Sequence, residues 1–535
     1  MLKFVASYFS PYKKRLTLVL VCSVLTAISE LSTPYFTAKF IDEILVSKSY
    51  DTFCSFIALI AFVCVLAILA NYIYIVASTK VQFLLIRDMV QDITEHVQRL
   101  SVAFLGSMDM TYLSKRIEQD TRDLVSFVLG SIIDISIQII ILATTTSLLF
   151  TIDIFWVAIF IAIAFIHLVL YRLHKKALLD VSLLLREQEG RFFSALTDNY
   201  IYSYSIKLHS LYKEFIEKFR QKYNDYYVAG VRRLKVSFWF TNTRFNSGRI
   251  FSLFIFMIGG YQVLEGNMSI GNFVALNGYF IISMEGIYFF MNFGQGYQNA
   301  LSAYSRITEI MNQPVANNGN LKLNSIRNIS VENVSYYVDG KAILPKVSFS
   351  FQTGKVYCLT GRNGTGKSTL INLLLGMYEP TDGIIMYDGV NISQLDMIDA
   401  RRRLISIAEQ KDFIPYDRPN DNISLGYNIN EEQKNGCIKG FSLCKALLEN
   451  RSVIAENSLS GGEKKKIALV RALTQNTDLL ILDEPDNNLD ASSISFLISE
   501  LKCAKKKRIV IIVSHEPQFM EFADEVIKLG MDKGA

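Results

Sequence analysis

A glycine-rich stretch in the last third of this 535-residue chain has the residue types that bind phosphate. Residues 361–369 are GRNGTGKST, which fits the pattern G-x-x-x-x-G-K-[ST]. Glycines let backbone N–H groups turn towards phosphate oxygens, and the start of the next helix adds partial positive charge. An apolar strand, 356–360, and a helical pattern, 370–375, flank the loop as this chemistry requires. The sequence predicts phosphate contacts from Asn363, Gly364, Thr365, Gly366, Lys367, Ser368 and Thr369.

Two adjacent carboxylates end a second apolar strand, at residues 479–484. A buried strand would bring Asp483 to Mg²⁺ together with the Ser368 hydroxyl, and Glu484 would point at an attacking water. An incidental acidic turn after a core strand is the alternative. A further motif close by in the sequence weighs against that alternative.

This further motif, LSGGE at residues 459–463, opens a basic helix over residues 464–473. A helix start of this composition binds anions, so Ser460, Gly461 and Gly462 could hold the γ-phosphate of a nucleotide bound elsewhere. His515 follows the strand at 510–513 and could contact the same phosphate. A histidine considered alone is more often an ordinary surface residue.

The composition indicates a membrane protein with a soluble part. Half of the residues are hydrophobic and only 20% are charged, and the mean hydropathy is +0.26. These values exclude a disordered chain, and a net charge of +5 is too small to indicate a polyanionic partner. The basic runs at 464–466 and 505–508 are interpreted as solvated helix faces, so no nucleic-acid partner is expected.

Six apolar stretches are candidates for membrane-spanning helices within a domain covering residues 1–312. Lysine and arginine are abundant before the first stretch and in the long segments 79–125 and 172–246, whereas the three opposite loops hold only Lys39 and Lys48. This bias places both termini in the cytosol. The two long segments look helical, which indicates that the spans extend into the cytosol. The predicted spans are residues 16–36, 54–77, 126–150, 154–171, 246–264 and 272–293.

A polar linker, 313–325, precedes a region in which short β-rich runs alternate with helical patterns. This alternation predicts an α/β domain over residues 326–535 with a largely parallel sheet, which would include 331–337 and 347–351. The fold class is therefore an all-α six-helix transmembrane domain followed by an α/β P-loop ATPase domain.

The order of these motifs resembles that of the nucleotide-binding domain of an ABC transporter, and the whole chain resembles a half-transporter of the exporter type. The resemblance implies ATP and Mg²⁺ as cofactors and a homodimer in which Lys367 of one copy and Ser460 of the other enclose each ATP. It assigns Gln410 to the loop that senses Mg²⁺, Asp490 to the D-loop and His515 to the switch. Turns at 107–112 and 208–212 match the coupling helices. On this basis the catalytic residues are Glu484, His515 and Gln410, and the metal ligands are Ser368, Gln410 and Asp483.

The sequence departs from the family pattern at two places. The aromatic residue that usually stacks on adenine is replaced by Val338, and Tyr337 is the substitute that we expect to contact the base. Residues 451–458 lack the glycine-containing acidic segment that exporters have before LSGGE.

The cargo is predicted from family habit rather than from any residue. We expect an exporter in the cytoplasmic membrane that moves an amphipathic molecule, with a peptide as the first guess, then a lipid or a drug. Five polar or charged residues lie in or beside the spans, where they would line a wet cavity or make interhelical hydrogen bonds: Glu30, Asp134, His167, Arg249 and Glu285. For Arg249 an interfacial position is the alternative to the cavity. The alternatives are a nucleotide-gated or sensor subunit, one half of a heterodimer, or an importer.

Overall fold

The computed structural model describes the whole chain except residues 48, 107, 109, 339, 363, 417, 428, 444–458 and 531–535. The chain divides into two compact units. The helical unit comprises residues 1–97 and 111–312, and the α/β unit comprises residues 98–110 and 313–535.

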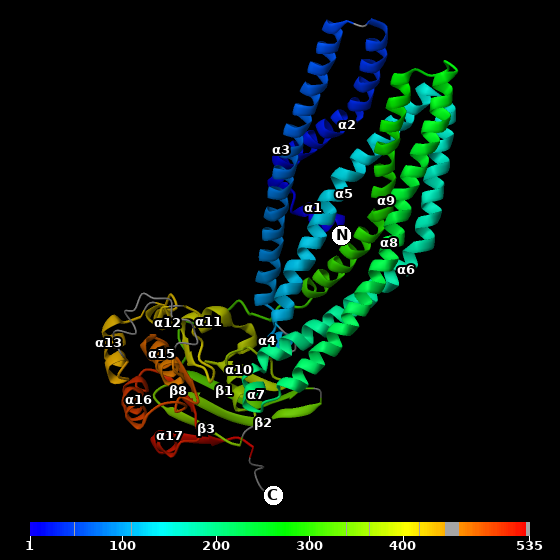
Figure 1. The fold of residues 1–535 in the computed structure, drawn as a ribbon. Helices are drawn as coiled ribbons and strands as arrows, with labels where there is room; N and C mark the ends of the chain where they lie inside the picture. The colour runs from blue at the N-terminus through cyan, green and yellow to red at the C-terminus, as the bar shows by residue number, and fades with distance from the viewer. Residues whose placement is uncertain are drawn as a thin grey trace. The chain divides into compact units, whose positions relative to one another are not determined.

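The helical unit is built from long helices (Figure 1). Short helices are found at the N-terminus, α1 (Leu2–Ser7) and η1 (Ser10–Tyr12), and between α6 and α8, where α7 is Ser203–Leu208. The long helices are α2 (Lys13–Ser47), α3 (Tyr50–Gln98), α5 (Met110–Ile152), α6 (Ile154–Ile201), α8 (Tyr212–Leu264) and α9 (Ile270–Met311).

Five stretches in the described part of the chain are long and apolar enough to cross a membrane: Ser10–Leu45, Tyr50–Gln98, Arg116–Ile152, Ile154–Leu173 and Ile270–Met311. In α3 the most apolar window has a mean hydropathy of 3.0 and few buried residues, which suits contact with lipid. The fifth predicted span ends α8, where the apolar described part, Arg249–Leu264, is shorter than the other five.

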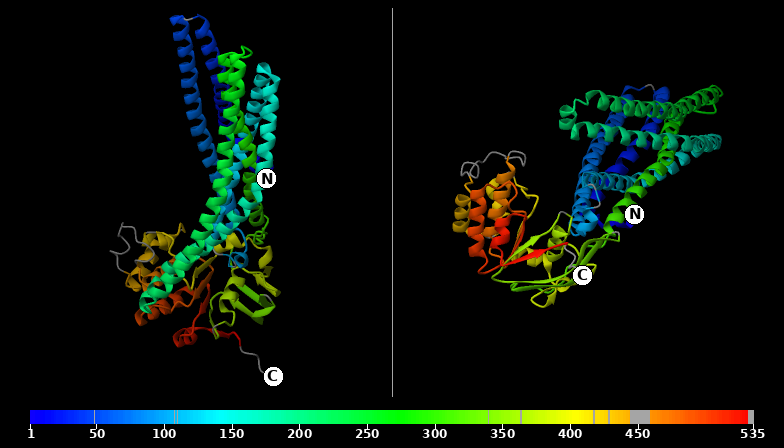
Figure 2. Two further views of the ribbon diagram at one scale, coloured as in Figure 1. Left: turned by 45° about the vertical axis from the view of Figure 1, so that its right-hand side comes forward. Right: turned by 90° about the horizontal axis from the view of Figure 1, so that it is seen from below.

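Within the helical unit, α6 runs along α8 and α2 packs against α9 (Figure 2). A core of large side chains from α6, α8 and α9 includes the buried rings of Trp156, Phe280 and Tyr288. His167 is also buried, with Nδ1 2.9 Å from the Ile163 carbonyl oxygen and Nε2 3.2 Å from the Tyr288 hydroxyl. This histidine therefore joins α6 to α9 by a hydrogen bond. Of the two roles expected for it, a cavity lining and an interhelical hydrogen bond, the structure shows the hydrogen bond.

The strands of the α/β unit form two sheets. The parallel sheet has the order β6-β7-β8-β3-β9, made of Ile405–Ala408, Leu479–Asp483, Ile509–Val513, Val356–Thr360 and Glu525–Lys528. The antiparallel sheet has the order β2-β1-β4-β5, made of Lys341–Gln352, Asn328–Val338, Asp382–Tyr387 and Val390–Asn391.

The antiparallel sheet corrects one expectation from the sequence. The runs 331–337 and 347–351 were predicted in a largely parallel sheet, but they belong to β1 and β2, which pair antiparallel. Only two residues separate these strands, and a parallel pair needs a crossover of a dozen or more residues.

Helices cover the parallel sheet, and two apolar cores result. One core lies between the two sheets and includes α10 (Lys367–Leu374), and the other lies under α13 (Glu431–Gly440), α15 (Gly461–Thr474) and α16 (Ala491–Ala504). The remaining helices are α4 (Val102–Gly106), η2 (Ile392–Gln394), α11 (Met397–Arg403), α12 (Pro419–Ser424) and α17 (Pro517–Phe522).

The two turns matched to coupling helices differ in how much of them is described. Of the first, 107–112, residues 107 and 109 lie outside the described residues, and the preceding α4 belongs to the α/β unit. The second, 208–212, connects the end of α7 to the start of α8. Their coupling role stays a prediction.

Candidate functional site

The parallel sheet brings the predicted site residues to one edge, because β6, β7, β8 and β3 are neighbours and all point the same way. The glycine-rich loop follows β3, Gln410 follows β6, Glu484 follows β7 and His515 follows β8. Carboxyl ends of parallel strands are where such sheets bind ligands.

The loop between β3 and α10 is folded around Lys367, whose side chain is buried. Its Nζ donates to the carbonyl oxygens of Gly361 at 2.7 Å and Arg362 at 3.2 Å, and lies 3.3 Å from His515 Nε2. Gly366 has a φ of +88°, and a Cβ there would lie 2.7 Å from the Ile343 carbonyl oxygen, so only glycine fits. The loop therefore holds an ammonium group and the start of a helix in position for phosphate. Asn363 lies outside the described residues.

Asp483 is a buried carboxyl group at the end of β7, with 8% of the residue exposed. Burial raises its pKa to about 6, and the neighbouring charge of Glu484 adds to the effect, while Lys465 and Lys367 oppose it. This carboxylate is short of positive charge, which a bound cation would supply.

Glu484 has a backbone conformation that few non-glycine residues adopt, with a φ of +46°. Its N–H donates to the Val513 carbonyl oxygen of β8 at 2.9 Å, which holds the strained residue in place. Its Oε2 accepts hydrogen bonds from Gln410 Nε2 at 2.9 Å and from Asn487 Nδ2 at 2.6 Å. Strain of this kind is concentrated at functional sites.

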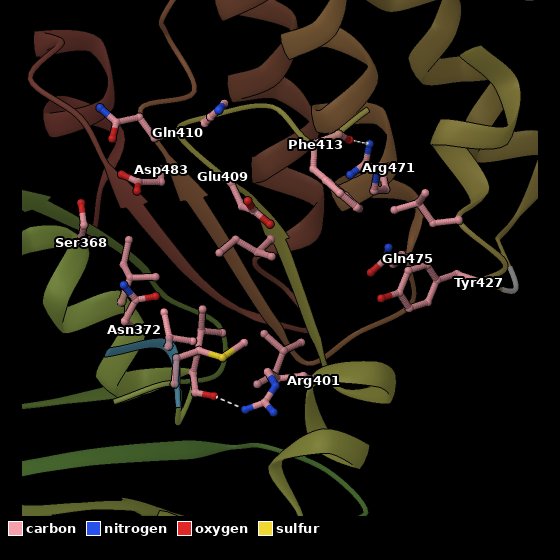
Figure 3. A pocket seen from close by; sticks show the side chains of 18 residues that line it. Ser368, Asn372, Arg401, Glu409, Gln410, Phe413, Tyr427, Arg471, Gln475 and Asp483 are labelled. Carbon is pink, nitrogen blue, oxygen red and sulfur yellow. Dashed lines mark hydrogen bonds between the residues drawn. The ribbon is translucent and has the colours of Figure 1, made fainter. Parts of the chain in front are cut away.

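A cavity of about 590 Å³ opens beside these residues. Ser368, Asp483 and Gln410 line one end of it, and Arg471, Gln475 and Tyr427 line the other (Figure 3). A hydroxyl, a carboxylate and an amide oxygen are suitable ligands for Mg²⁺, which usually takes only a few protein oxygens together with phosphate and water. The described residues contain no cluster of three or more His, Cys, Asp or Glu side chains that would hold a metal on its own.

The LSGGE segment forms the start of α15 with a capping box. The Ser460 hydroxyl accepts from the Glu463 N–H at 3.3 Å, and the Glu463 carboxylate accepts from the Ser460 N–H at 2.8 Å. Gly461 and Gly462 lie against Asn488, because a Cβ at either would come within 3.2 Å of it. Within the described part of one chain, no hydrogen bond joins Ser460 to Lys367 or Asp483. The two features predicted to bind phosphate are thus separate elements of one chain.

Asp490 caps the start of α16, where its carboxylate accepts from the Ser493 N–H at 2.7 Å and from the Ser492 hydroxyl at 2.8 Å. Lys466 Nζ lies 3.3 Å from the same carboxylate, on Oδ2. The hydrogen bonds from Ser493 and Ser492, together with Lys466, lower the pKa of Asp490. The segment before α16 is therefore attached to α15.

Tyr337, the predicted adenine contact, lies near the end of β1 with 43% of the residue exposed. Its neighbour Tyr336 instead stacks on Tyr378, with ring centroids 5.2 Å apart. The exposed ring of Tyr337 is available for stacking, and its role with adenine stays a prediction.

The interpretation of the basic runs as solvated helix faces is wrong for two residues. Lys465 is 1% exposed, and its Nζ donates to the carbonyl oxygens of Glu409 at 3.0 Å and Gln410 at 3.4 Å and pairs with Asp412 at 3.3 Å. Arg508 is buried as well. Helical periodicity could have revealed that Lys465 is buried. It shares the i, i+3, i+4, i+7 face of α15 with the buried apolar residues Ala468, Leu469 and Ala472.

The fold and the site define a membrane protein that carries a P-loop nucleotide-binding domain in the same chain. The chain belongs to the ABC transporter family: residues 16–286, half of the chain, match the ABC transporter transmembrane region, and residues 344–487 match the ABC transporter domain. It is a multi-pass membrane protein of the half-transporter type, as the resemblance implied.

Known relatives and structures agree with this assignment. The chain is 26% identical to an ATP-dependent lipid A-core flippase of Haemophilus influenzae over 97% of this chain and 90% of that protein. A flippase with the same description from another strain of that species is 31% identical, over 50% of this chain and 47% of the flippase, so that alignment spans about half of the relative. A bacterial Atm1-family ABC exporter with ATP bound has the same fold, with a TM-score of 0.83, 17% identity and coverage of 96% and 94%.

Proposed function

We propose that two copies of this chain form an ATP-driven exporter that moves a lipid across the cytoplasmic membrane. The observation that carries the proposal is the set of hydrolytic residues at one sheet edge, in a chain that also supplies long apolar helices. Lys367 lies at the phosphate loop, and Asp483 lies at the end of β7. Glu484 follows Asp483 and accepts a hydrogen bond from Gln410. The complete set favours a working ATPase over a sensor subunit.

The chain's own groups account for the main requirements of phosphoryl transfer, which are positioning and neutralisation of charge. The loop N–H groups and Lys367 bind the phosphates, Glu484 orients the attacking water, and His515 contacts the γ-phosphate. Ser368, Asp483 and Gln410 would hold Mg²⁺, which supplies further neutralisation of phosphate charge when bound.

A second copy supplies the missing phosphate contact. Ser460 makes its hydrogen bonds at the start of α15 and, among the residues that the structure describes, none with the phosphate loop of its own chain, so a partner's LSGGE segment would close the site. Both termini and the ATPase domain lie in the cytosol in this arrangement, as the distribution of basic residues predicts.

A lipid replaces the peptide that was the first guess for the cargo. Several relatives that match this chain are described as lipid A-core flippases, one of them over almost the whole chain, whereas others are described only as export or transporter proteins.

The test is ATP hydrolysis by the full chain in lipid nanodiscs, beside Glu484→Gln. We expect turnover in the wild type and a loss of about 100-fold or more in the variant, with ATP binding retained. Adding a lipopolysaccharide-type lipid should stimulate the wild-type rate, and an amphipathic peptide should not. Bound ATP without turnover in the wild type would contradict the exporter proposal, and stimulation by peptide alone would contradict the cargo.

A further inference from the structure

Two amide groups from two different loops converge on one oxygen of Glu484. Gln410 follows β6 and Asn487 follows β7, and both donate to Oε2, at 2.9 and 2.6 Å. The other carboxylate oxygen, Oε1, has no hydrogen bond within the part of the chain that the structure describes. Oε2 is therefore held in place by two hydrogen bonds, and Oε1 is available to accept another one.

The backbone between Glu484 and Asn487 explains why this amide reaches the carboxylate. The Asn487 N–H lies 3.4 Å from the Glu484 carbonyl oxygen, so residues 484–487 form a tight turn that includes Pro485. The turn brings the side chain of Asn487 back over that of Glu484. A carboxylate can only accept hydrogen bonds, so Asn487 acts here as a donor through Nδ2.

We propose that Asn487 is a positioning residue for Glu484. Together with Gln410 it fixes the plane of the carboxylate through Oε2 and leaves Oε1 to accept a hydrogen bond from the attacking water. This inference rests on the proposed ATPase function and adds a residue to it. A charge-assisted hydrogen bond at 2.6 Å is of the strong kind that can hold a side chain in one orientation.

Both arms of this arrangement are attached to α15, which begins with the LSGGE segment. Lys465 of α15 holds the backbone oxygen of Gln410 at 3.4 Å. Lys466 of α15 pairs with Asp490 at 3.3 Å, three residues beyond Asn487. α15 therefore contacts both of the loops that hold Glu484.

The test compares steady-state ATP hydrolysis of the full chain in nanodiscs with Asn487→Asp and Asn487→Ala. Asn487→Asp has the same shape, but it replaces the donating amide by a second carboxylate, which repels Glu484. We expect kcat to fall by about tenfold or more for Asn487→Asp and by less for Asn487→Ala. The KM for ATP should stay within about twofold, because in this proposal Asn487 orients Glu484 towards the attacking water and does not contact ATP.

Asn391→Asp is the matched control, because the amide oxygen of Asn391 accepts hydrogen bonds from the Ser393 N–H at 3.0 Å and hydroxyl at 2.9 Å. Aspartate retains that acceptor, so this variant should keep the wild-type kcat. The inference is overturned if Asn487→Asp keeps the wild-type kcat, or if KM rises and the melting temperature falls along with kcat. Glu484→Gln in the same preparation separates the two proposals: an active Glu484→Gln defeats the proposed function, whereas an inactive one beside an active Asn487→Asp defeats only the positioning role.

Discussion

Two adjacent carboxylates end β7, and their surroundings give them different properties. Asp483 is buried beside Lys465 and Lys367, with a pKa raised to about 6, whereas Glu484 is partly exposed and receives two amide hydrogen bonds. Asp483 is the last residue of β7, whereas Glu484 follows the strand with a φ of +46°, so the two carboxylates are held by different backbone conformations. The different properties of the two carboxylates follow from this change of backbone conformation at the end of the strand.

Asp483→Asn is expected to stabilise the protein at pH 8 in EDTA without nucleotide. Because the folded pKa of about 6 is above the ordinary 3.8, the folded form binds more protons between these values, and the free energy of unfolding falls as pH rises from 4 to 6. Asparagine has the same shape as aspartate but carries no charge, so the variant avoids the cost of burying an ionised carboxylate. The melting temperature of the variant should therefore exceed that of the wild type by a few degrees at pH 8. The difference should vanish near pH 4, and a variant no more stable than the wild type at pH 8 would contradict the assignment.

At the scale of elements, α2 and α9 pack closely because α9 places glycines against α2. A Cβ at Gly271 would lie 2.2 Å from the Ala38 carbonyl oxygen, and a Cβ at Gly278 would lie 3.0 Å from Pro34. At the same end Asp42 of α2 accepts from the Ser269 hydroxyl at 2.7 Å and from the Gly271 N–H at 2.8 Å. Backbone contact and a side-chain cap thus fix the start of α9 on α2.

Gly271→Ala should destabilise the helical unit, because the new methyl group meets backbone that cannot move aside. Overpacking of this kind costs about 1–3 kcal/mol, more than the helix propensity gained from alanine. The measurement is thermal unfolding of the full chain in nanodiscs. Gly260→Ala in α8 is the matched control, since nothing lies within 4 Å of a Cβ there, and it should leave the melting temperature unchanged or slightly raised. Equal melting temperatures for the two variants would refute the close-packing argument.

At the scale of the whole molecule, the phosphate loop and the LSGGE segment of one chain make no hydrogen bond with each other in the described residues, which is why the proposal needs two copies. In a head-to-tail pair, each ATP lies between Lys367 of one copy and Ser460 of the other. A symmetric dimer contains two such composite sites.

Two inactive variants should therefore complement each other. Lys367→Ala and Ser460→Arg each destroy both sites of their own homodimer, but a mixed dimer retains one intact site. After random exchange of subunits half of the dimers are mixed, so ATPase activity should recover to about a quarter of the wild-type value. The measurement is hydrolysis after co-reconstitution, with each variant alone as the control. An absence of recovery in verified mixed dimers would argue against independent composite sites.

The sequence by itself determined the features that are local along the chain. The phosphate loop between β3 and α10, the carboxylates at the end of β7 and the cap at Ser460 each need only a strand, a loop and a helix in immediate succession. Long apolar stretches likewise identify membrane helices, and the motifs together identified the family and the fold class, which the comparisons confirm. The roles of Gln410, Asp490 and Tyr337 and the cargo were taken from family resemblance.

The tertiary structure decided the features that depend on contacts between distant residues. Gln410 meets Glu484 across 74 positions of sequence, Lys465 is buried beneath the loop that follows β6, and Asn487 turns its amide back onto the carboxylate of Glu484. The antiparallel sheet also emerged only here, because strand pairing is set by the length of connections and by the core between the sheets. A local pattern specifies which side chains are present, whereas their partners follow from how the strands and helices pack.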